Sequence, residues 1–256
     1  FVNQKEAENL GSKDFVDKLD WIVYNSNWNF EKHVYQFKIP ENKLMVIRNA
    51  IEKIDFVEKP KDKINLIYHT TPWRGLVHLL KVFKSLNLTN VVLNVCSSTI
   101  IYGKKFDSVL GKKYEGIFNE CKNTKNVNYL GFLENKKIIE LLKKMHIFAH
   151  PSIWPETSCV AAIEAMAAGC ETVTTNLGAL YETCSPFGTF VNFDRNFDNL
   201  EKRYSKVLSN SIKNYWSDEN QNKLKLQRES INATYSWDVR SVEWKNFFNE
   251  ARELKV

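Results

Sequence analysis

The sequence predicts an α/β protein built on a Rossmann-like, doubly wound parallel sheet. From about residue 64 onward, short apolar segments of strand length alternate with amphipathic segments of helix length. A charged, proline-containing stretch at 57–63 separates this region from a shorter N-terminal region. The composition is 43% hydrophobic and 26% charged, as in an ordinary globular protein. Strands separated by helices of this length favour a parallel sheet with helices on both faces.

The region after residue 63 contains six expected strands, at 64–69, 91–96, 127–130, 147–150, 172–175 and 189–193. Helices are expected at 76–86, within 106–121, at 135–145, and from residue 157 or 158 to Gly169. The first of these helices shows the periodic apolar pattern of one buried face, formed by Leu76, Leu79, Leu80, Val82 and Phe83.

The N-terminal region is expected to form strands at 21–24 and 44–47 and a helix at about 28–37. Two strands are too few for an independent core. The segment therefore either packs on the main domain or ends a preceding domain, and the lack of a starting Met agrees with a chain that begins inside a longer protein. A last helix should start after Ser236 and run to about residue 254, and its apolar side chains need a partner surface.

The net charge of +6 comes with lysines spread along nearly every expected helix. A solvated basic surface is the simplest interpretation, and attraction to a nucleotide diphosphate, an anionic membrane or nucleic acid is the alternative. Nucleic acid is the least favoured, because the basic residues are not clustered with aromatic ones. Five cysteines without a Cys-x-x-Cys pair indicate reduced, buried thiols and a cytoplasmic setting. No His/Cys cluster has metal-ligand spacing, so no metal site is expected.

The segment 150–169 is the most informative part of the sequence. A strand ends at His150, Pro151 and Pro155 hold a loop open, and Thr157 or Ser158 is placed to cap the helix that follows. Doubly wound folds bind ligands at the carboxyl ends of their strands, where this loop lies. The free N–H groups at the start of the helix suit a diphosphate.

Glu156 and Glu164 lie eight residues apart in this segment. On a helix that separation is roughly 12 Å, about the reach from a sugar across a diphosphate to a ribose. Carboxylates accept hydrogen bonds from sugar hydroxyls. The alternative is that both are ordinary charges at helix ends.

Two glutamates with this spacing, the second beginning Glu-Ala-Met-Ala-Ala-Gly, resemble the signature of retaining GT-B glycosyltransferases of the family-4 type. The resemblance extends from about residue 21 to the C-terminus. It implies that Glu156 is the catalytic-site residue that contacts the donor sugar and that Glu164 holds the ribose. It also places the backbone of Thr157, Ser158 and Cys159 near the sugar and the distal phosphate.

Two further segments carry the same resemblance. Where this chain has Tyr68-His69 the family commonly has Gly-Arg, and where it has Arg74-Gly75 the family has Lys-Gly. In the family both basic side chains bind the diphosphate. Arg74 keeps its cation, whereas His69 departs from the pattern and would be only partly charged near neutral pH. The donor-binding residues implied here are His69, Thr70, Thr71, Arg74 and Gly75, and those implied at the nucleobase are Gly131, Phe132 and Leu133. Each of these assignments has a structural alternative. His69 would be a hydrogen-bonded histidine at the end of a strand, Arg74 a solvated arginine at the start of a helix, and 127–133 plain core and turn.

The resemblance implies three parts. Residues 1–56 are the end of an N-terminal acceptor domain with the hinge, and residues 57–234 are the nucleotide-sugar-binding domain. Residues 235–256 form a helix that crosses back to the N-terminal domain. The expected partners are a nucleotide-diphospho-sugar, an unknown acceptor (glycan, lipid or protein) and a missing N-terminal domain, with neither cofactor nor metal required. The expected location is cytoplasmic, with peripheral membrane contact as an option. Rival functions are a non-catalytic nucleotide-sugar-binding module, an epimerase or phosphorylase, and a nucleic-acid-binding domain.

Overall fold

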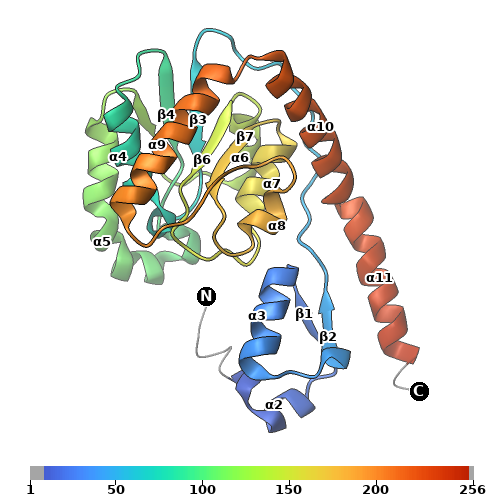
Figure 1. Cartoon of the computed structure of the whole chain (residues 1–256). Coiled ribbons are helices and arrows are strands. Elements are labelled where there is room, and N and C mark those ends of the chain that lie inside the picture. Colours follow the sequence, from blue (N-terminus) through green and yellow to red (C-terminus); the bar gives the residue numbers. More distant parts are fainter. Residues whose placement is uncertain (1–8, 254–256) are drawn as a thin grey trace.

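The computed structural model describes residues 9–253, which form a large α/β domain, a small N-terminal unit and a long C-terminal helix (Figure 1). The strands are β1 (Ile22–Tyr24), β2 (Leu44–Val46), β3 (Ile64–Tyr68), β4 (Val91–Val95), β5 (Val127–Tyr129), β6 (Ile147–His150), β7 (Glu171–Thr175) and β8 (Thr189–Val191). The α-helices are α2 (Lys13–Asp17), α3 (Asn27–Phe37), α4 (Leu76–Leu86), α5 (Lys104–Asn123), α6 (Asn135–Leu142), α7 (Val160–Ala167), α8 (Leu180–Cys184), α9 (Phe197–Asn214), α10 (Asp218–Thr234) and α11 (Trp237–Glu253). Short 3₁₀ helices include η3 (Pro72–Arg74) and η4 (Ile100–Tyr102).

The main sheet has six strands in the order β5-β4-β3-β6-β7-β8, and every neighbouring pair is parallel. Leu66 of β3 lies opposite Leu93 of β4 on one side and Ile147 of β6 on the other. The chain winds outward in one direction from β3 and in the other from β6. The predicted doubly wound parallel sheet is therefore confirmed, and its order reverses between β3 and β6, where such sheets open a crevice.

The sheet separates two apolar layers, because successive strand residues point to opposite faces. Leu66 packs on one face with α4 and α9, in a cluster that includes Leu79 and Tyr204. Ile67 packs on the other face with α6 and α7, in a cluster that includes Ile163. Burial on both faces explains why β3, β6 and β7 are wholly buried.

The charged stretch at 57–63 is tied to the main domain by Lys59. The side chain is only 6% exposed, and its ammonium donates to the carbonyl oxygens of Leu142 (2.9 Å) and Ala168 (2.8 Å). These carbonyls lie at the ends of α6 and α7, where helices leave acceptors without partners. The stretch therefore anchors two helix ends of the main domain, which its charged composition did not predict.

The N-terminal unit pairs β1 with β2 in a two-stranded parallel sheet around a small cluster that contains Val16, Tyr24, Ile39 and Leu44. Helix α11 runs back alongside this unit (Figure 1), and its Phe247 ring meets the Trp21 ring edge-on at 5.7 Å. The expected partner surface of the last helix thus includes the N-terminal unit. Among the described residues, no helix is long and apolar enough to span a bilayer.

Glu182 of α8 joins the two parts of the molecule. Its carboxylate accepts hydrogen bonds from the backbone N–H groups of Asn27 (3.0 Å) and Trp28 (2.9 Å), the first two residues of α3. It also pairs with the Arg48 guanidinium at 3.1 Å. One carboxylate of the main domain thus caps a helix of the N-terminal unit. The preceding loop stays close enough for the Asn25 amide to reach the Thr157 hydroxyl at 3.4 Å.

Candidate functional site

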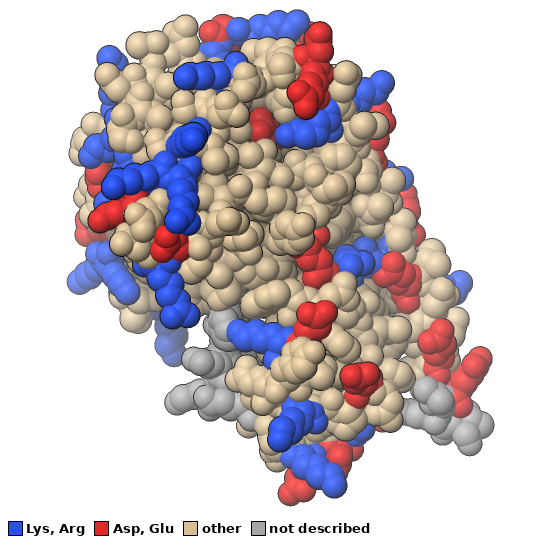
Figure 2. Space-filling model, viewed as in Figure 1, with Lys and Arg blue, Asp and Glu red and all other residues tan. Residues whose placement is uncertain are grey.

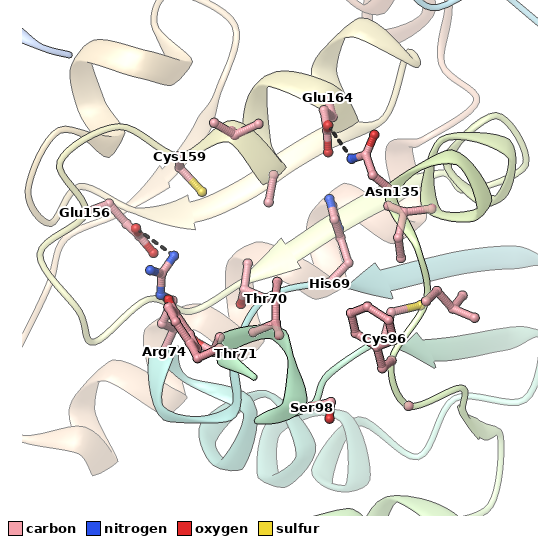
Figure 3. A pocket seen from close by; sticks show the side chains of 18 of the residues that line it. His69, Thr70, Thr71, Arg74, Cys96, Ser98, Asn135, Glu156, Cys159 and Glu164 are labelled. Carbon is pink, nitrogen blue, oxygen red and sulfur yellow. Dashed lines mark hydrogen bonds and ion pairs between the residues drawn. The ribbon is translucent and has the colours of Figure 1, made fainter. Parts of the chain in front are cut away.

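A pocket of about 560 Å³ opens at the carboxyl ends of β3, β4, β5 and β6, beside the reversal of strand order (Figure 3). The structure brings twelve of the thirteen predicted site residues to its wall: His69, Thr70, Thr71, Arg74, Gly131, Phe132, Leu133, Glu156, Thr157, Ser158, Cys159 and Glu164. Residues from three separate sequence segments therefore meet in one cavity.

Gly75, the thirteenth, is not part of the pocket wall. Its φ is +129°, and a Cβ placed on it would lie 2.2 Å from the Pro151 carbonyl oxygen. Gly178 allows a similar close approach in the middle of the 151–159 loop, where a Cβ would lie 2.6 Å from the backbone N and O of Glu156. The two glycines therefore let neighbouring backbone approach the loop at its start and at Glu156.

Glu156 sits in a buried charge cluster. One carboxylate oxygen, Oε2, accepts a hydrogen bond from the Arg74 guanidinium at 2.9 Å, and the glutamate is only 3% exposed. The other, Oε1, lies 3.6 Å from Nε2 of His150 and has no hydrogen-bond partner among the described residues. Burial lowers the pKa of His150, so the free oxygen faces a neutral imidazole. Glu156 is therefore fixed by Arg74, with one buried acceptor atom left unpaired.

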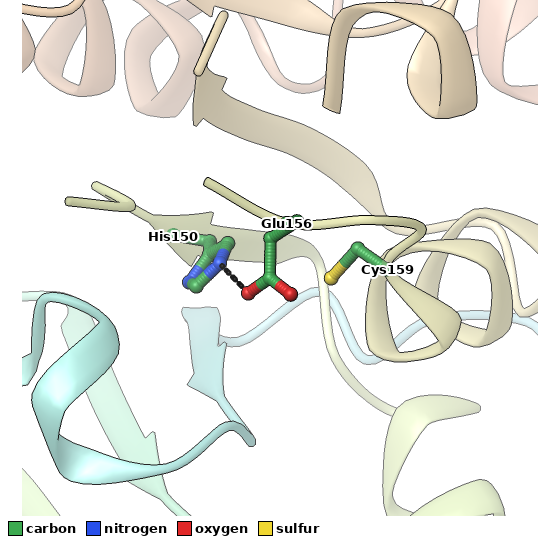
Figure 4. A group of neighbouring side chains, drawn as sticks. All are labelled: His150, Glu156 and Cys159. Atoms are coloured by element: carbon green, nitrogen blue, oxygen red, sulfur yellow. Dashed lines mark ion pairs between the residues drawn. The ribbon is translucent and has the colours of Figure 1, made fainter. Parts of the chain in front are cut away.

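His150, Glu156 and Cys159 also form a trio whose potential ligand atoms lie within 4.8 Å of one another (Figure 4). Sequence spacing did not reveal this grouping. Two features work against a cation there: Arg74 already places positive charge on Glu156, and burial raises the pKa of the Cys159 thiol well above its ordinary value. The expectation that no metal is needed stays a prediction.

Glu164 occupies another part of the pocket, on α7. Its Oε1 accepts a hydrogen bond from the side-chain amide of Asn135 at 2.8 Å, and the residue is 8% exposed (Figure 3). Burial raises the pKa of this carboxyl, and the Asn135 hydrogen bond opposes part of the rise. Asn135 is a site residue that the sequence analysis missed; a polar residue at the start of a helix, directly after the 131–133 turn, was the available signal.

His69 is half-buried in the pocket wall with both ring nitrogens shielded from solvent, and its ring packs on Phe148 with 4.8 Å between centroids. Burial, reinforced by the nearby His150, lowers the pKa of His69 to about 3. The expectation of a partly charged histidine near neutral pH is therefore wrong for the free protein. Its two nitrogens and the hydroxyls of Thr70 and Thr71 have no hydrogen-bond partners among the described residues. Such a row of unpartnered polar groups is what a polar ligand would satisfy.

Helix α7 starts later than the sequence suggested. Its N-cap is Cys159, which gives no side-chain cap, so the expectation that Thr157 or Ser158 caps the helix is wrong. Both residues line the pocket instead. Glu156 precedes the helix, so the helical estimate of its distance from Glu164 does not apply. The first residues of α7 face the pocket and bring the positive end of the helix dipole to it.

The remaining wall was not foreseen from the sequence: Cys96, Ser98, Ile101, Tyr102, Asn135, Ile138, Val160 and Ala161. Most of them follow the carboxyl end of a strand or begin a helix. In a parallel sheet these positions converge on one edge, which was the signal that could have found them.

The chain resembles known proteins over most of its length. The family model described as glycosyl transferases group 1 matches residues 48–225. An uncharacterized glycosyltransferase of Methanocaldococcus jannaschii is 26% identical over 85% of this chain and 57% of its own length. An uncharacterized protein from the cps region of Klebsiella pneumoniae is 25% identical over 69% of this chain and 49% of its own. The chain thus spans about half the length of these curated relatives.

Solved structures share the fold. A glycosyltransferase from Rickettsia africae superposes with a TM-score of 0.72 at 17% identity, over 97% of this chain and 67% of its own. The sucrose-phosphate synthase of Thermosynechococcus elongatus has a TM-score of 0.74 and 15% identity, over 99% of this chain and 63% of its own. Anabaena HepE in complex with UDP-glucose has a TM-score of 0.72 and 15% identity, over 95% of this chain and 68% of its own. The family model matches more than half of the chain, and the parallel sheet and its pocket agree with that match. The chain therefore belongs to the glycosyl transferases group 1, a family of glycosyltransferases with the GT-B fold.

Proposed function

We propose that this chain is the donor-binding part of a retaining glycosyltransferase that uses a nucleoside-diphospho-sugar. The observation that carries the proposal is the distribution of charge around one pocket. Glu156 lies on the Arg74 side, Glu164 lies on the Asn135 side, and the start of α7 separates them (Figure 3). A donor has the complementary order of groups: sugar hydroxyls, an anionic diphosphate, then ribose hydroxyls.

Each group of the donor meets suitable chemistry in this arrangement. The free Oε1 of Glu156 accepts from a sugar hydroxyl, and Glu164 accepts from the ribose. Arg74, the N-terminus of α7 and the unpartnered hydroxyls of Thr70 and Thr71 bind the diphosphate. The backbone at 131–133 contacts the nucleobase. Structures with the same fold support a nucleotide-sugar ligand, because HepE binds UDP-glucose and the pneumococcal O-GlcNAc transferase GtfA binds UDP and GlcNAc.

Transfer requires stabilisation of the departing diphosphate. Arg74 and the α7 dipole lie at the place where its charge grows. In this proposal they offset that charge without a metal ion. Retention of configuration follows from the family resemblance of Glu156 and Glu164, and the acceptor is a glycan, a lipid or a protein.

The chain alone is proposed to hold the donor without appreciable transfer. All pocket-lining residues fall between His69 and Glu164, so the N-terminal unit contributes none of them. Transfer needs an acceptor held against the donor with water excluded. Robust turnover by the 256-residue chain on a broad acceptor panel would show that the N-terminal unit contains an acceptor site.

Donor binding is tested by calorimetry with nucleoside-diphospho-sugars, nucleoside diphosphates and nucleosides. Arg74→Ala should weaken every diphosphate by about tenfold to a hundredfold, as expected for a hydrogen bond to a charged group, and leave the nucleoside nearly unchanged. Arg195→Ala, an exposed arginine outside the pocket, is the matched control. Equal weakening of nucleoside and diphosphate would remove Arg74 from the phosphate site, and absence of binding by the folded wild type to any donor would refute the proposed function.

A further inference from the structure

Asn135 and Glu164 form a polar pair in the wall of the pocket. Glu164 lies on α7 and is buried, whereas Asn135 is the first residue of α6 and is exposed. Both side chains line the pocket, and the amide of Asn135 donates to Glu164 Oε1 at 2.8 Å. The pair therefore extends from a buried part of the wall to an exposed part.

The local structure of α6 gives the Asn135 side chain no other role. Asparagine is a poor helix former and favours N-cap positions, where its side-chain oxygen accepts a backbone N–H. Here the N-cap is Glu134, which makes no side-chain capping hydrogen bond, and Asn135 already lies inside the helix. Among the described residues, Glu164 is the only hydrogen-bond partner of the Asn135 side chain. The side chain therefore serves the pocket rather than the helix.

The pair leaves two oxygen atoms for a ligand. A carboxylate offers only acceptors, so Asn135 turns its amide nitrogen to Glu164 and its Oδ1 away from it (Figure 3). The second carboxylate oxygen, Glu164 Oε2, has no hydrogen-bond partner within the described part of the chain. Glu164 Oε2 and Asn135 Oδ1 are thus two unused acceptors on side chains that are already in contact.

Two such acceptors match the two neighbouring hydroxyls of a ribose, at C2′ and C3′, because each hydroxyl donates one hydrogen bond. Only one residue separates Asn135 from Leu133, at the end of the turn that the proposed function places at the nucleobase. The sugar attached to that base would therefore lie beside the pair. A deoxyribose has no hydroxyl at C2′ and would leave one acceptor without a donor, which weakens binding.

The surface charge of the protein cannot make this distinction. Lys and Arg side chains lie among Asp and Glu side chains over most of the face in Figure 2, and the net charge of the chain is +6. Such a surface attracts nucleotides of equal charge equally. Ribonucleotides and deoxyribonucleotides carry the same charge, so a choice between them has to come from hydrogen bonds inside the pocket.

We propose that Asn135 is a second ribose-binding residue beside Glu164, and that the pair selects ribonucleotide donors over deoxyribonucleotide donors. One ribose hydroxyl donates to Glu164 Oε2 and the other donates to Asn135 Oδ1. The hydrogen bond between the two side chains holds both acceptors in place. Donors built on deoxythymidine are thereby disfavoured. This inference rests on the proposed function, because it requires a nucleotide in the pocket.

Selection for ribose is tested by calorimetry at pH 8, which favours the carboxylate form of Glu164. The ligands are UDP, CDP, GDP and ADP, each with its 2′-deoxy and 3′-deoxy analogues, so that base and phosphates stay the same within a set. Loss of either hydroxyl should weaken binding about tenfold.

The outcomes of this comparison separate the two proposals. Equal affinity for a ribonucleotide and both of its deoxy analogues would overturn the inference and leave the proposed function intact. Preference for deoxythymidine diphosphate over all four ribonucleotides would do the same. If the folded chain binds none of these nucleotides, the proposed function itself fails.

The part played by Asn135 is tested with the same ligands on the Asn135→Ala variant. Loss of one uncharged hydrogen bond should weaken the ribonucleotide about threefold to tenfold. It should leave the affinity for one of the two deoxy analogues unchanged, because that analogue lacks the hydroxyl that Asn135 binds. A purely structural role would weaken all three ligands equally, and that result would overturn the assignment.

The Asn135→Asp variant keeps the size of the side chain but turns an acceptor toward Glu164 in place of a donor. The two carboxylates repel each other, so this variant should weaken the ribonucleotide at least as much as Asn135→Ala does. Asn214→Ala, at an exposed asparagine of α9 outside the pocket, is the matched control and should change no affinity. Wild-type affinity for the ribonucleotide in both Asn135 variants would overturn the inference.

Discussion

Replacing Glu182 with alanine should loosen the N-terminal unit without unfolding the main domain. The variant loses the cap on the first two amides of α3, about 1 kcal/mol. It also loses about 0.5 kcal/mol of favourable interaction with the helix dipole. The ion pair with Arg48 adds about 0.5 kcal/mol, a low figure because Arg48 is 43% exposed. The sum, about 2 kcal/mol, corresponds to a roughly thirtyfold larger population of the undocked state.

Hydrogen exchange of the α3 amides measures this population directly, because local opening exposes them to solvent. Protection should fall about thirtyfold in α3 of Glu182→Ala and stay unchanged in α6 and α7. Glu140→Ala removes an exposed carboxylate of α6 that pairs with Lys143 directly after the helix, and it should leave α3 as it is in the wild type. Unchanged α3 exchange in Glu182→Ala would refute the reasoning, and so would an equal loss of protection throughout the main domain, which would indicate global destabilisation.

Three further predictions concern two buried charged groups, Glu164 and Lys59. Since burial raises the pKa of Glu164, its carboxylate is protonated at a higher pH than a free glutamate. Donor affinity should therefore fall as pH decreases through that raised pKa, beginning above about 4.3, and the Glu164→Gln variant should bind more weakly with no such pH step. By linkage, the same group should favour the folded state at low pH and lose that contribution as pH rises through the raised pKa, which urea titrations at several pH values would detect. Lys59→Met should lower the free energy of unfolding by about 2–4 kcal/mol, because two buried carbonyls lose their hydrogen-bond donor. Lys61→Met, at an exposed position, should change the free energy of unfolding little. Equal effects of the two substitutions would contradict this account.

Much of the fold was accessible from the sequence because its signals are local. Strand-length apolar segments between amphipathic helices indicated the doubly wound sheet, and all six of its strands were anticipated. The C-terminal turn of α7 follows from a single residue, since Gly169 adopts a φ of +78° there. Most of the pocket wall was anticipated from the resemblance of the segments at 68–76, 127–133 and 150–169 to a known family, and convergence of the loops after parallel strands explains why these segments meet.

The rest depends on contacts between distant residues. Glu164 and Asn135 are 29 positions apart, and only the packing of α6 against α7 brings them together. Helix α10 was not foreseen because it docks partly through Gln227, whose amide donates to the Met166 and Cys170 carbonyls, rather than through a continuous apolar stripe. The charge state of His69 is set by burial, which no local pattern reports. Helix α9 was a genuine oversight, because Leu200, Tyr204 and Leu208 carry a regular helical period.

The wall of the pocket is drawn from one uninterrupted stretch of sequence, from residue 69 to residue 164. The donor recognition that we propose is therefore encoded by a contiguous block of the gene. A single recombination event could exchange that block whole, replacing one ligand preference with another. The swapped block would still have to meet Gly178, which lies outside it and leaves room for the backbone of Glu156. That glycine is thus a junction that any such chimera would need to keep.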